Sequence, residues 1–120
     1  MSSKKITSSQ KGKLAEKLAI DYLLAKGFEL LACNYYTRHG EIDIIVQNKE
    51  FTVFVEVKYR KSKTFYHPRE TVNSPKIKKI LASSNDYIQK NNLNDHNFRF
   101  DIIEISGSDF ILEHLENAFY

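Results

Sequence analysis

The sequence predicts a mixed α/β domain of three layers, in which helices cover both faces of a mixed β-sheet. Two segments repeat apolar residues at helical spacing, and five others read as strands, in the order α-β-β-β-α-β-β. Two of these strands, Gly40 to Gln47 and Phe51 to Lys58, alternate in the side chains they place on each face. A helix that crosses between strands implies a mixed sheet covered on both sides. The 120 residues suffice for one domain with a real core, spanning 1–120, of which we expect 1–8 to be flexible.

Residues Lys11 to Lys26 form the first predicted helix. We expect its N-cap at Ser8 or Ser9, because a hydroxyl oxygen can accept hydrogen bonds from the first amides of a helix. Gly27 then ends the helix at the position after the C-cap. The predicted apolar stripe consists of Leu14, Ala15, Leu18, Ala19, Tyr22 and Leu23.

A second helix and five strands complete the prediction. Ser74 and Pro75 begin that helix, as a cap followed by a proline that fits the first turn, and a loop containing Pro68 precedes it. The apolar stripe of this helix consists of Ile77, Ile80, Leu81, Tyr87 and Ile88. The predicted strands are Phe28 to Tyr35, Gly40 to Gln47, Phe51 to Lys58, Phe98 to Ile105 and Phe110 to Leu115.

The second and third strands carry charges where a strand would normally bury Val or Ile. If Asn48-Lys49 forms a tight turn, Asp43 lies opposite Phe54 and is a diagonal neighbour of Glu56. Diagonal neighbours on one face are roughly 7–8 Å apart at the backbone, so both carboxylates could reach one ion. Lys58 follows Glu56 by two residues and therefore shares its face.

Two carboxylates and a lysine at one edge of a sheet suit a metal-dependent phosphodiester hydrolase. The carboxylates would hold a hard cation such as Mg²⁺ or Mn²⁺, and the lysine would orient a water or stabilise developing charge. The alternative is that these charges mark the solvated face of a hairpin. Ile45 and Phe54 lie on the same face, so that face is not simply exposed. The pattern alone leaves both interpretations open.

Glu16 is a further candidate, flanked by Ala15 and Leu18 at the edge of the first helix's apolar stripe. A helix packed over the sheet could present it to the same site as a third carboxylate. A glutamate in such a position is more often exposed to solvent, and the sequence alone favours that simpler interpretation.

Basic residues are concentrated downstream of the proposed site. Between Lys58 and Lys79 there are eight basic residues and a single acid, whereas the segment from Asn91 to the end holds six acids and one arginine. This asymmetry predicts a surface that faces a polyanion, although a solvated lysine-rich surface would look the same. The candidate phosphate contacts are Arg60, Lys61, Lys63, Lys76, Lys78 and Lys79.

The cysteine and histidine content argues against other classes of site. A single cysteine, Cys33, excludes a disulfide framework and a multi-cysteine zinc site, and its apolar surroundings predict an inert core thiol. The four histidines lack the spacing of zinc ligands. Without a long apolar stretch, we expect a soluble, cytoplasmic protein that does not contact membranes.

The ordered motifs of nearly the whole chain resemble the PD-(D/E)xK nuclease superfamily, and within it most closely the bacterial YraN-like family. That family in turn resembles archaeal Holliday-junction resolvases, which implies a restriction-endonuclease-like α/β fold. The motifs are Gly12-x-x-x-Glu16, Asn34, Gly40-Glu41-Ile42-Asp43-Ile44-Ile45, Val53-Phe54-Val55-Glu56-Val57-Lys58-x-Arg60, Lys76 to Lys79, Arg99-Phe100-Asp101 and Asn117-Ala118-Phe119.

This resemblance implies roles for four residues. Asp43 and Glu56 would be metal ligands, Lys58 the catalytic lysine, and Glu16 the carboxylate supplied by the helix, as in the resolvase-like branch. Relatives of that branch dimerise to cut two strands, so a homodimer is also an expectation.

The sequence is therefore interpreted as that of a Mg²⁺-dependent nuclease acting on DNA, selective for structure rather than for base sequence. Asp43, Glu56 and a backbone carbonyl near Val57 would hold the ion, with waters completing an octahedron. Two alternatives remain at this point. One is a nucleic-acid-binding module with this fold but little or no turnover. The other is an interaction protein whose acidic C-terminal third docks on a basic partner.

Overall fold

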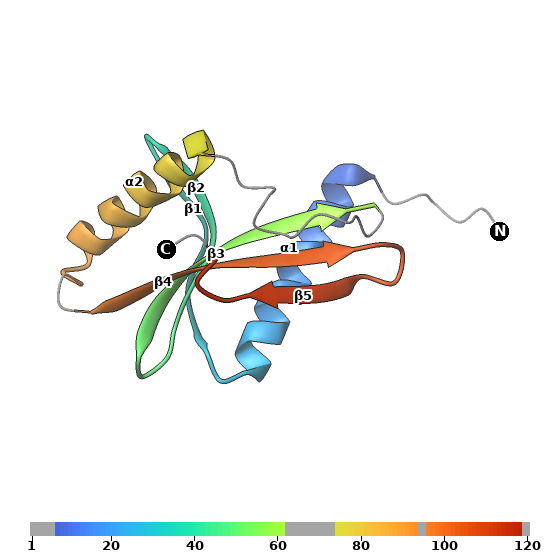
Figure 1. Cartoon of the computed structure of the whole chain (residues 1–120), viewed down its shortest axis with the longest axis horizontal. Helices are drawn as coiled ribbons and strands as arrows, with labels where there is room; N and C mark the ends of the chain where they lie inside the picture. Colours follow the sequence, from blue (N-terminus) through green and yellow to red (C-terminus); the bar gives the residue numbers. More distant parts are fainter. Residues whose placement is uncertain (1–6, 62–73, 94–95, 119–120) are drawn as a thin grey trace.

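The computed structural model describes residues 7–61, 74–93 and 96–118. The described elements follow the predicted order α-β-β-β-α-β-β, which confirms the fold class (Figure 1). The predicted loop around Pro68 and residues 1–6 of the segment expected to be flexible lie outside the described residues. The elements are α1 (Ser8–Ala25), β1 (Glu29–Thr37), β2 (Gly40–Gln47), β3 (Phe51–Arg60), α2 (Ser74–Lys90), β4 (Asn97–Ser106) and β5 (Ile111–Leu115).

The described strands form one mixed sheet in the order β1-β2-β3-β4-β5. Neighbours are antiparallel except β3 and β4, which run parallel from the pair Phe51–Asn97 to the pair Arg60–Ser106. Parallel neighbours need a crossover connection, and α2 lies in the segment between them. The two helices lie on opposite faces of the sheet, as Figure 1 shows.

Helix α1 packs on the sheet through small residues. Ala15, Ala19 and Leu23 are buried at four-residue intervals, so they form one stripe along the helix. Small side chains at two of these positions let the helix backbone approach the sheet. The stripe rests on aliphatic side chains of β2, β3 and β4, which are Ile44, Val46, Val53, Val55, Ile103 and Ile105.

The N-cap of α1 is Thr7, and the prediction of Ser8 or Ser9 was wrong. Thr7 Oγ1 accepts from Gln10 N at 3.1 Å, and Thr7 N donates to Gln10 Oε1 at 2.8 Å. This capping box satisfies two amides that would otherwise lack partners. The helix consequently begins at Ser8 instead of Lys11. At the other end, Gly27 has φ 96°, which confirms it as the residue that ends the helix.

Helix α2 covers an aromatic cluster on the other face. Ile80 and Tyr87 are buried as predicted, and Tyr87 meets the ring of Phe54 edge-on at 6.1 Å. The ring of Phe54 also stacks on Phe100 of β4 at 5.4 Å. Phe54 therefore anchors the sheet beneath α2, and its face of the hairpin is not a simple solvated surface. Within the described ranges, neither helix is long and apolar enough to cross a membrane.

The β2–β3 hairpin has a different register from the predicted one. Its ladder pairs Ile44 with Val55 and Gln47 with Thr52, a shift of two residues. The turn lies one residue later, because Asn48 closes it: Asn48 N donates to Phe51 O at 2.9 Å, and Asn48 Oδ1 accepts from Phe51 N at 2.7 Å. A shift of two preserves the alternation of faces, so the predicted faces survive.

Cys33 is exposed, contrary to the prediction of a core thiol. It lies on β1, which forms one edge of the described sheet. The apolar neighbours of Cys33 in sequence suggested burial, but an edge strand can turn such a residue to solvent.

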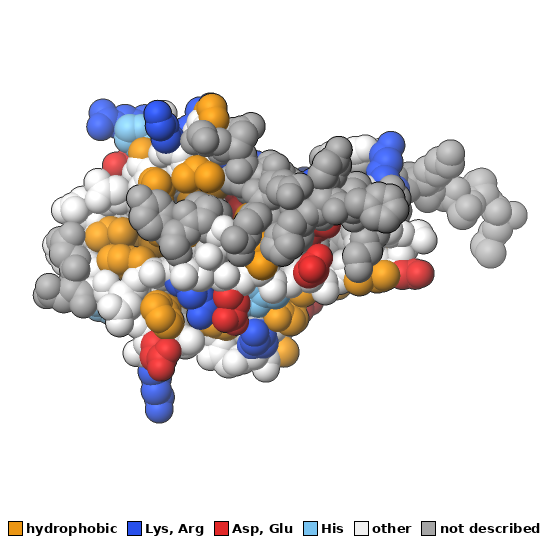
Figure 2. Space-filling view, in the orientation of Figure 1, with side chains coloured by type: hydrophobic (Ala, Val, Ile, Leu, Met, Phe, Trp, Pro, Cys, Tyr) orange, Lys and Arg blue, Asp and Glu red, His pale blue; other side chains and the backbone are white. Residues whose placement is uncertain are grey.

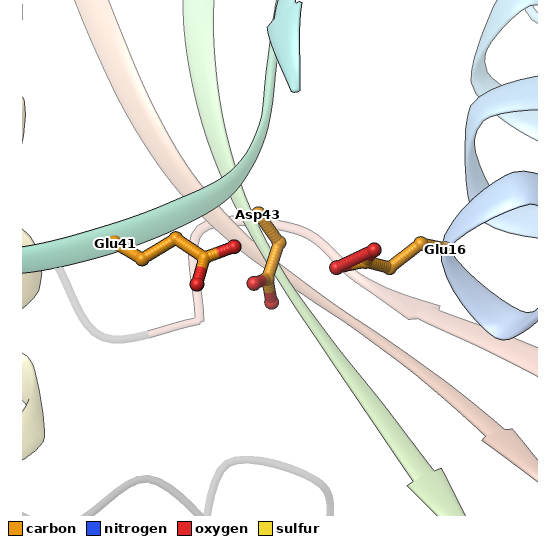
Figure 3. Close-up of side chains that lie close together, drawn as sticks. All are labelled: Glu16, Glu41 and Asp43. Atoms are coloured by element: carbon orange, nitrogen blue, oxygen red, sulfur yellow. The ribbon is translucent and has the colours of Figure 1, made fainter. Parts of the chain in front are cut away.

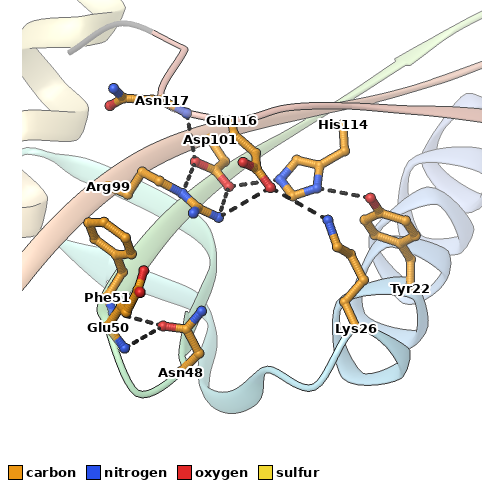
Figure 4. Close-up of polar contacts among 10 residues, drawn as sticks. All are labelled: Tyr22, Lys26, Asn48, Glu50, Phe51, Arg99, Asp101, His114, Glu116 and Asn117. Atoms are coloured by element: carbon orange, nitrogen blue, oxygen red, sulfur yellow. Dashed lines mark hydrogen bonds and ion pairs between the residues drawn. The ribbon is translucent and has the colours of Figure 1, made fainter.

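A buried ionic network joins β4, β5 and α1 (Figure 4). Asp101 is fully buried and accepts two hydrogen bonds from Arg99, each of 2.9 Å. His114 Nε2 lies 2.7 Å from Asp101 Oδ2, and its Nδ1 lies 3.0 Å from the hydroxyl of Tyr22. Asn117 N also donates to Asp101, at 3.0 Å. Because Asp101 is buried and contacts polar groups of three other residues, we interpret this network as structural.

Candidate metal centre

The candidate site lies where β2 and β3 separate. Their ladder ends at the pair Ile44–Val55, while β2 continues beside β1 and β3 continues beside β4. Asp43 is the first β2 residue beyond the ladder, and its Oδ2 accepts from Val57 N at 2.8 Å. The side chain thus occupies the position that a ladder partner would have taken.

Three carboxylates converge at this opening (Figure 3). One oxygen each of Glu16, Glu41 and Asp43 lies within 4.8 Å of the others. Figure 3 shows Glu16 reaching across from α1, while Glu41 and Asp43 project from β2. The structure therefore places the helix-borne glutamate at the site, and the simpler interpretation of Glu16 as an exposed residue was wrong.

Asn34 of β1 holds two of these carboxylates in place. With its amide nitrogen turned toward them, it donates to Glu16 Oε1 at 3.1 Å and to Glu41 Oε1 at 2.6 Å. Asn34 has φ 50°, a left-handed conformation that asparagine adopts more readily than most residues. This local departure from strand geometry occurs beside Asp43, between the pairs Cys33–Ile44 and Tyr35–Ile42.

Glu56 adds a fourth carboxylate, together with two lysines. Its side chain is only 7% exposed, so its charge requires compensation. Lys58 Nζ lies 3.6 Å from Glu56 Oε1, and Lys76 Nζ of α2 lies 2.5 Å from the same oxygen. The prediction that Lys58 shares the face of Glu56 agrees with this geometry.

Burial and repulsion keep a proton on Asp43 near neutral pH. Burial raises the pKa of its carboxyl from 3.8 to about 8, aided by the negative charges of Glu56 and Glu16 and opposed by the hydrogen bond from Val57. Burial also raises the pKa of Glu16, with Glu41 and Glu56 contributing and Asn34 opposing. A cation placed among these carboxylates would therefore stabilise their charged forms.

The two lysines respond in opposite directions. Burial lowers the pKa of Lys58, and the neighbouring charge of Lys76 lowers it further against the attraction of Glu56. Burial would lower the pKa of Lys76 as well, but its contacts with Glu56 and Lys58 and the charge of Asp43 raise it overall. With its raised pKa, Lys76 stays protonated more readily than an ordinary lysine, whereas Lys58, with its lowered pKa, loses its proton more easily.

Asp43 lines a hollow on each side of the site. One hollow, of about 260 Å³, lies beside the first turns of α1. The other, of about 220 Å³, lies beside α2. The first is lined by Ser9, Gly12, Lys13, Ala15, Glu16, Asp43, Val57 and Tyr59. The second is lined by Gly40, Glu41, Asp43, Glu56, Lys76, Lys79 and Ile80.

The predicted phosphate-binding residues are divided among several places. Arg60 donates to Glu104 Oε2 at 2.9 Å, and Lys76 contacts Glu56. The exposed residues of the set are Lys61, Lys78 and Lys79, while Lys63 lies outside the described residues. Figure 2 shows Lys and Arg side chains gathered at the upper left, over the beginning of α2 and the turn between β1 and β2.

Three residues of the site were not assigned a role there from the sequence. Glu41 precedes Asp43 by two residues, so strand alternation alone could have identified it. Asn34 interrupts an apolar strand, which is a weaker signal. Lys76 belongs to a run of similar lysines, and only the tertiary structure distinguishes it from Lys78 and Lys79.

The donor set fits a hard divalent cation. The candidate ligands are carboxylate oxygens, which Mg²⁺, Mn²⁺ and Ca²⁺ prefer, whereas a zinc site would use sulfur or imidazole nitrogen. The excess of clustered carboxylates over nearby cations also matches a positively charged occupant.

Comparison with known proteins places the chain in a family. The model of the uncharacterised protein family UPF0102 matches residues 15–105. The chain belongs to the UPF0102 family. Its similarity to a UPF0102 protein of Clostridioides difficile (strain 630) is 43% identity over 95% of this chain and 100% of the relative. A UPF0102 protein of Alkaliphilus oremlandii is 45% identical, with 90% of this chain and 96% of the relative covered.

The family match includes the candidate centre. Residues 15–105 contain all four carboxylates and both lysines of the site, from Glu16 to Lys76. A third UPF0102 relative, from Sulfurihydrogenibium sp. (strain YO3AOP1), is 41% identical over 92% of this chain and 95% of its own length. The YraN-like assignment made from the motifs is thereby confirmed.

Proposed function

We propose that this UPF0102 member is a metal-dependent nuclease that hydrolyses phosphodiester bonds in DNA. One observation carries the proposal: Asp43, Glu56 and Lys58 meet at the opening between β2 and β3, and Glu16 joins them from α1. Four carboxylates around a partly enclosed space are costly for a fold unless they bind something positive.

The residues that would hold Mg²⁺ or Mn²⁺ are Asp43, Glu56 and the backbone carbonyl of Val57. The N–H and C=O of one strand residue point to the same side. Val57 N points to Asp43, so we expect its carbonyl to face the site as well. Glu16 and Glu41 would accept hydrogen bonds from waters around the ion. When bound, the ion would neutralise phosphate charge and lower the pKa of a water.

Lys58 is suited to the chemical step. Its strand position fixes it beside Glu56, and its lowered pKa lets it exchange a proton more readily than an exposed lysine. In its charged form, Lys58 would orient the attacking water and stabilise negative charge that develops on the phosphate.

The positively charged side chains around the site are suited to phosphate contacts, which supports a nuclease that recognises the structure of its DNA substrate rather than its base sequence. Lysines near the site, such as Lys78 and Lys79, would contact phosphates, which position a nucleic acid without reading its sequence. The two hollows flanking Asp43 would let a strand pass on either side of the centre. We therefore propose branched or flapped DNA as the substrate class.

The test is a cleavage assay on linear, flapped and four-way DNA, with and without Mg²⁺ or Mn²⁺. We expect metal-dependent cleavage by the wild type, none by Lys58→Ala, and impairment of both cleavage and metal binding by Glu56→Gln. Lys58→Ala should still bind metal, because Lys58 is not a ligand. Unchanged cleavage in Lys58→Ala would point to contamination or another site. Binding without cleavage of any DNA or RNA would instead favour a non-catalytic module.

A further inference from the structure

Lys76 is held in the candidate centre in a way that its place in a basic run does not explain. It lies in the first turn of α2, and its ammonium is closer to Glu56 Oε1 than that of Lys58 is, at 2.5 Å against 3.6 Å. Its side chain is 35% exposed, whereas that of Glu56 is almost fully buried. Lys76 thus reaches inward from the rim to neutralise a buried carboxylate.

The position of this ammonium conflicts with a metal on the same oxygen. A Mg²⁺ ion that takes Glu56 Oε1 as a ligand would approach this oxygen to about 2.0–2.1 Å, inside the present contact with Lys76. Two cations cannot share one carboxylate oxygen at such distances without strong repulsion. One of them must withdraw, and the partly exposed lysine on a flexible four-carbon stem is the one that can.

The hollow beside α2 gives the displaced ammonium a destination. Lys76 and Lys79 line it together with Glu56, and it is open to solvent. Lys58 projects from β3, where its backbone pairs with Glu104, and it does not line this hollow. Of the two lysines, Lys76 is therefore the one with space beside it into which its ammonium can move.

We propose that Lys76 is an exchangeable counter-ion, which neutralises Glu56 while the metal is absent and is transferred to a nucleic-acid phosphate when the metal binds. This inference rests on the proposed function, because it requires both a metal and a polyanion. It makes the two ligands cooperative: the metal releases Lys76 for the phosphate, and the phosphate holds Lys76 away from Glu56. By linkage, each ligand must raise the affinity of the other by the same factor.

Calorimetric titration with Mn²⁺ in the absence of DNA tests the exchange directly. We compare the wild type with Lys76→Met, which keeps an apolar stem, and Lys76→Gln, which keeps a polar one. Lys90→Met removes the same charge from the far end of α2 and serves as the control. Without the competing ammonium, both Lys76 variants should bind Mn²⁺ several-fold more tightly, while the control matches the wild type. Equal or weaker binding in folded Lys76 variants would overturn the exchange.

The cooperativity is tested by measuring the affinity for a four-way DNA junction with and without Ca²⁺ by fluorescence anisotropy. In the wild type and in Lys90→Met, Ca²⁺ should tighten DNA binding about fivefold or more. In both Lys76 variants this factor should fall toward one, and a retained factor would overturn the proposal. Failure of the proposed function is distinguishable, because a wild type that binds no Mn²⁺ would have no metal site at all.

Discussion

The carboxyl group of Asp43 connects the stability of the fold to pH. Its pKa in the folded state is about 8, compared with an ordinary value of 3.8, because of burial and the charges of Glu56 and Glu16. The folded state therefore holds a proton that the unfolded chain releases. This contribution to stability is fully present below about pH 3.8 and is lost as the pH rises through 8.

We accordingly predict that, as the pH rises from 6 to 9, the melting temperature of the metal-free wild type falls relative to that of Asp43→Asn. The amide cannot ionise, so the variant escapes the cost of placing a charge beside Glu56. A difference of ~1 kcal/mol in the free energy of unfolding corresponds to about 4 °C in a domain of this size. Parallel pH profiles of the two proteins in thermal scans would contradict the raised pKa.

Divalent cations should reverse this loss. Mn²⁺ at about 100 times its dissociation constant would add ~2.7 kcal/mol to the stability of the wild type by mass action. Asp43→Asn, which lacks one ligand charge, should gain much less. Thermal unfolding with millimolar Mn²⁺ or Mg²⁺ measures both shifts. If the two proteins gain equally, the ions bind elsewhere.

Those residues of the candidate site whose positions follow from strand alternation could be predicted from the sequence. Asp43, Glu56 and Lys58 could be predicted because a strand repeats every two residues, whatever its exact register. The position of Glu16 required the resemblance, since a helix's spacing does not say which edge of a sheet it approaches. The inward turn of Lys76 depends on how α2 docks, which no local pattern contains.

At the scale of elements, helix α1 has two roles. Its buried stripe packs on the sheet, and its first turns line the hollow beside the site. Gly12 lies within the helix, and a Cβ added there would meet no atom within 4 Å. It also lines the hollow that contains Glu16 and Lys13. The absence of a side chain therefore widens the hollow at the expense of helix stability.

Gly12→Ala should consequently stabilise the protein by about 0.5–1 kcal/mol, because glycine is a poor residue inside a helix. If DNA enters this hollow, the same change should weaken DNA binding. Urea unfolding and anisotropy on one preparation measure both effects, with Ala25→Gly as a control for helix propensity outside the hollow. A variant that is more stable and binds DNA normally would remove this hollow from the substrate path.

The network around Asp101 fastens β4, β5 and α1 together. Asp101→Asn would leave Arg99 with a weakened partner in a buried setting, and breaking one side of a buried ion pair typically costs roughly 3–5 kcal/mol. We expect a lower urea midpoint for the variant. The decrease should be the same with and without metal ions, since the network is separate from the metal centre. A loss smaller than ~1 kcal/mol would show that the network is not an anchor.

The elements illustrate why the fold was predictable and the details were not. Apolar periodicity located both helices and the strands to within a few residues, because burial on one face imposes it. The N-cap and the hairpin register were missed because each depends on one side chain, Gln10 in the capping box and Asn48 in the turn. Both errors are local and left the faces of the strands unchanged.

Across the whole molecule, the basic residues around the start of α2 should govern the salt dependence of DNA binding. Each phosphate neutralised on duplex DNA contributes about −0.9 to the slope of log affinity against log salt. Replacing the exposed Lys78 and Lys79 by Ala should therefore flatten the slope by about 1.8 and weaken all sequences alike. Lys17→Ala with Lys49→Ala is the control at exposed positions elsewhere. An unchanged slope in the Lys78 and Lys79 variant would identify them as an ordinary solvated surface.

The parallel pairing of β3 with β4 has a consequence for the order in which the chain folds. The segments α1, β1, β2 and β3 meet through short connections, whereas Phe51 must wait for Asn97, far along the chain. Closing the longer loop costs more entropy, so we expect the N-terminal half to assemble first. That half brings together Glu16, Glu41, Asp43 and Glu56 before α2 arrives with Lys76. Dissolved cations would then act as folding aids, shielding an acidic cluster that still lacks the charge of Lys76 during this interval.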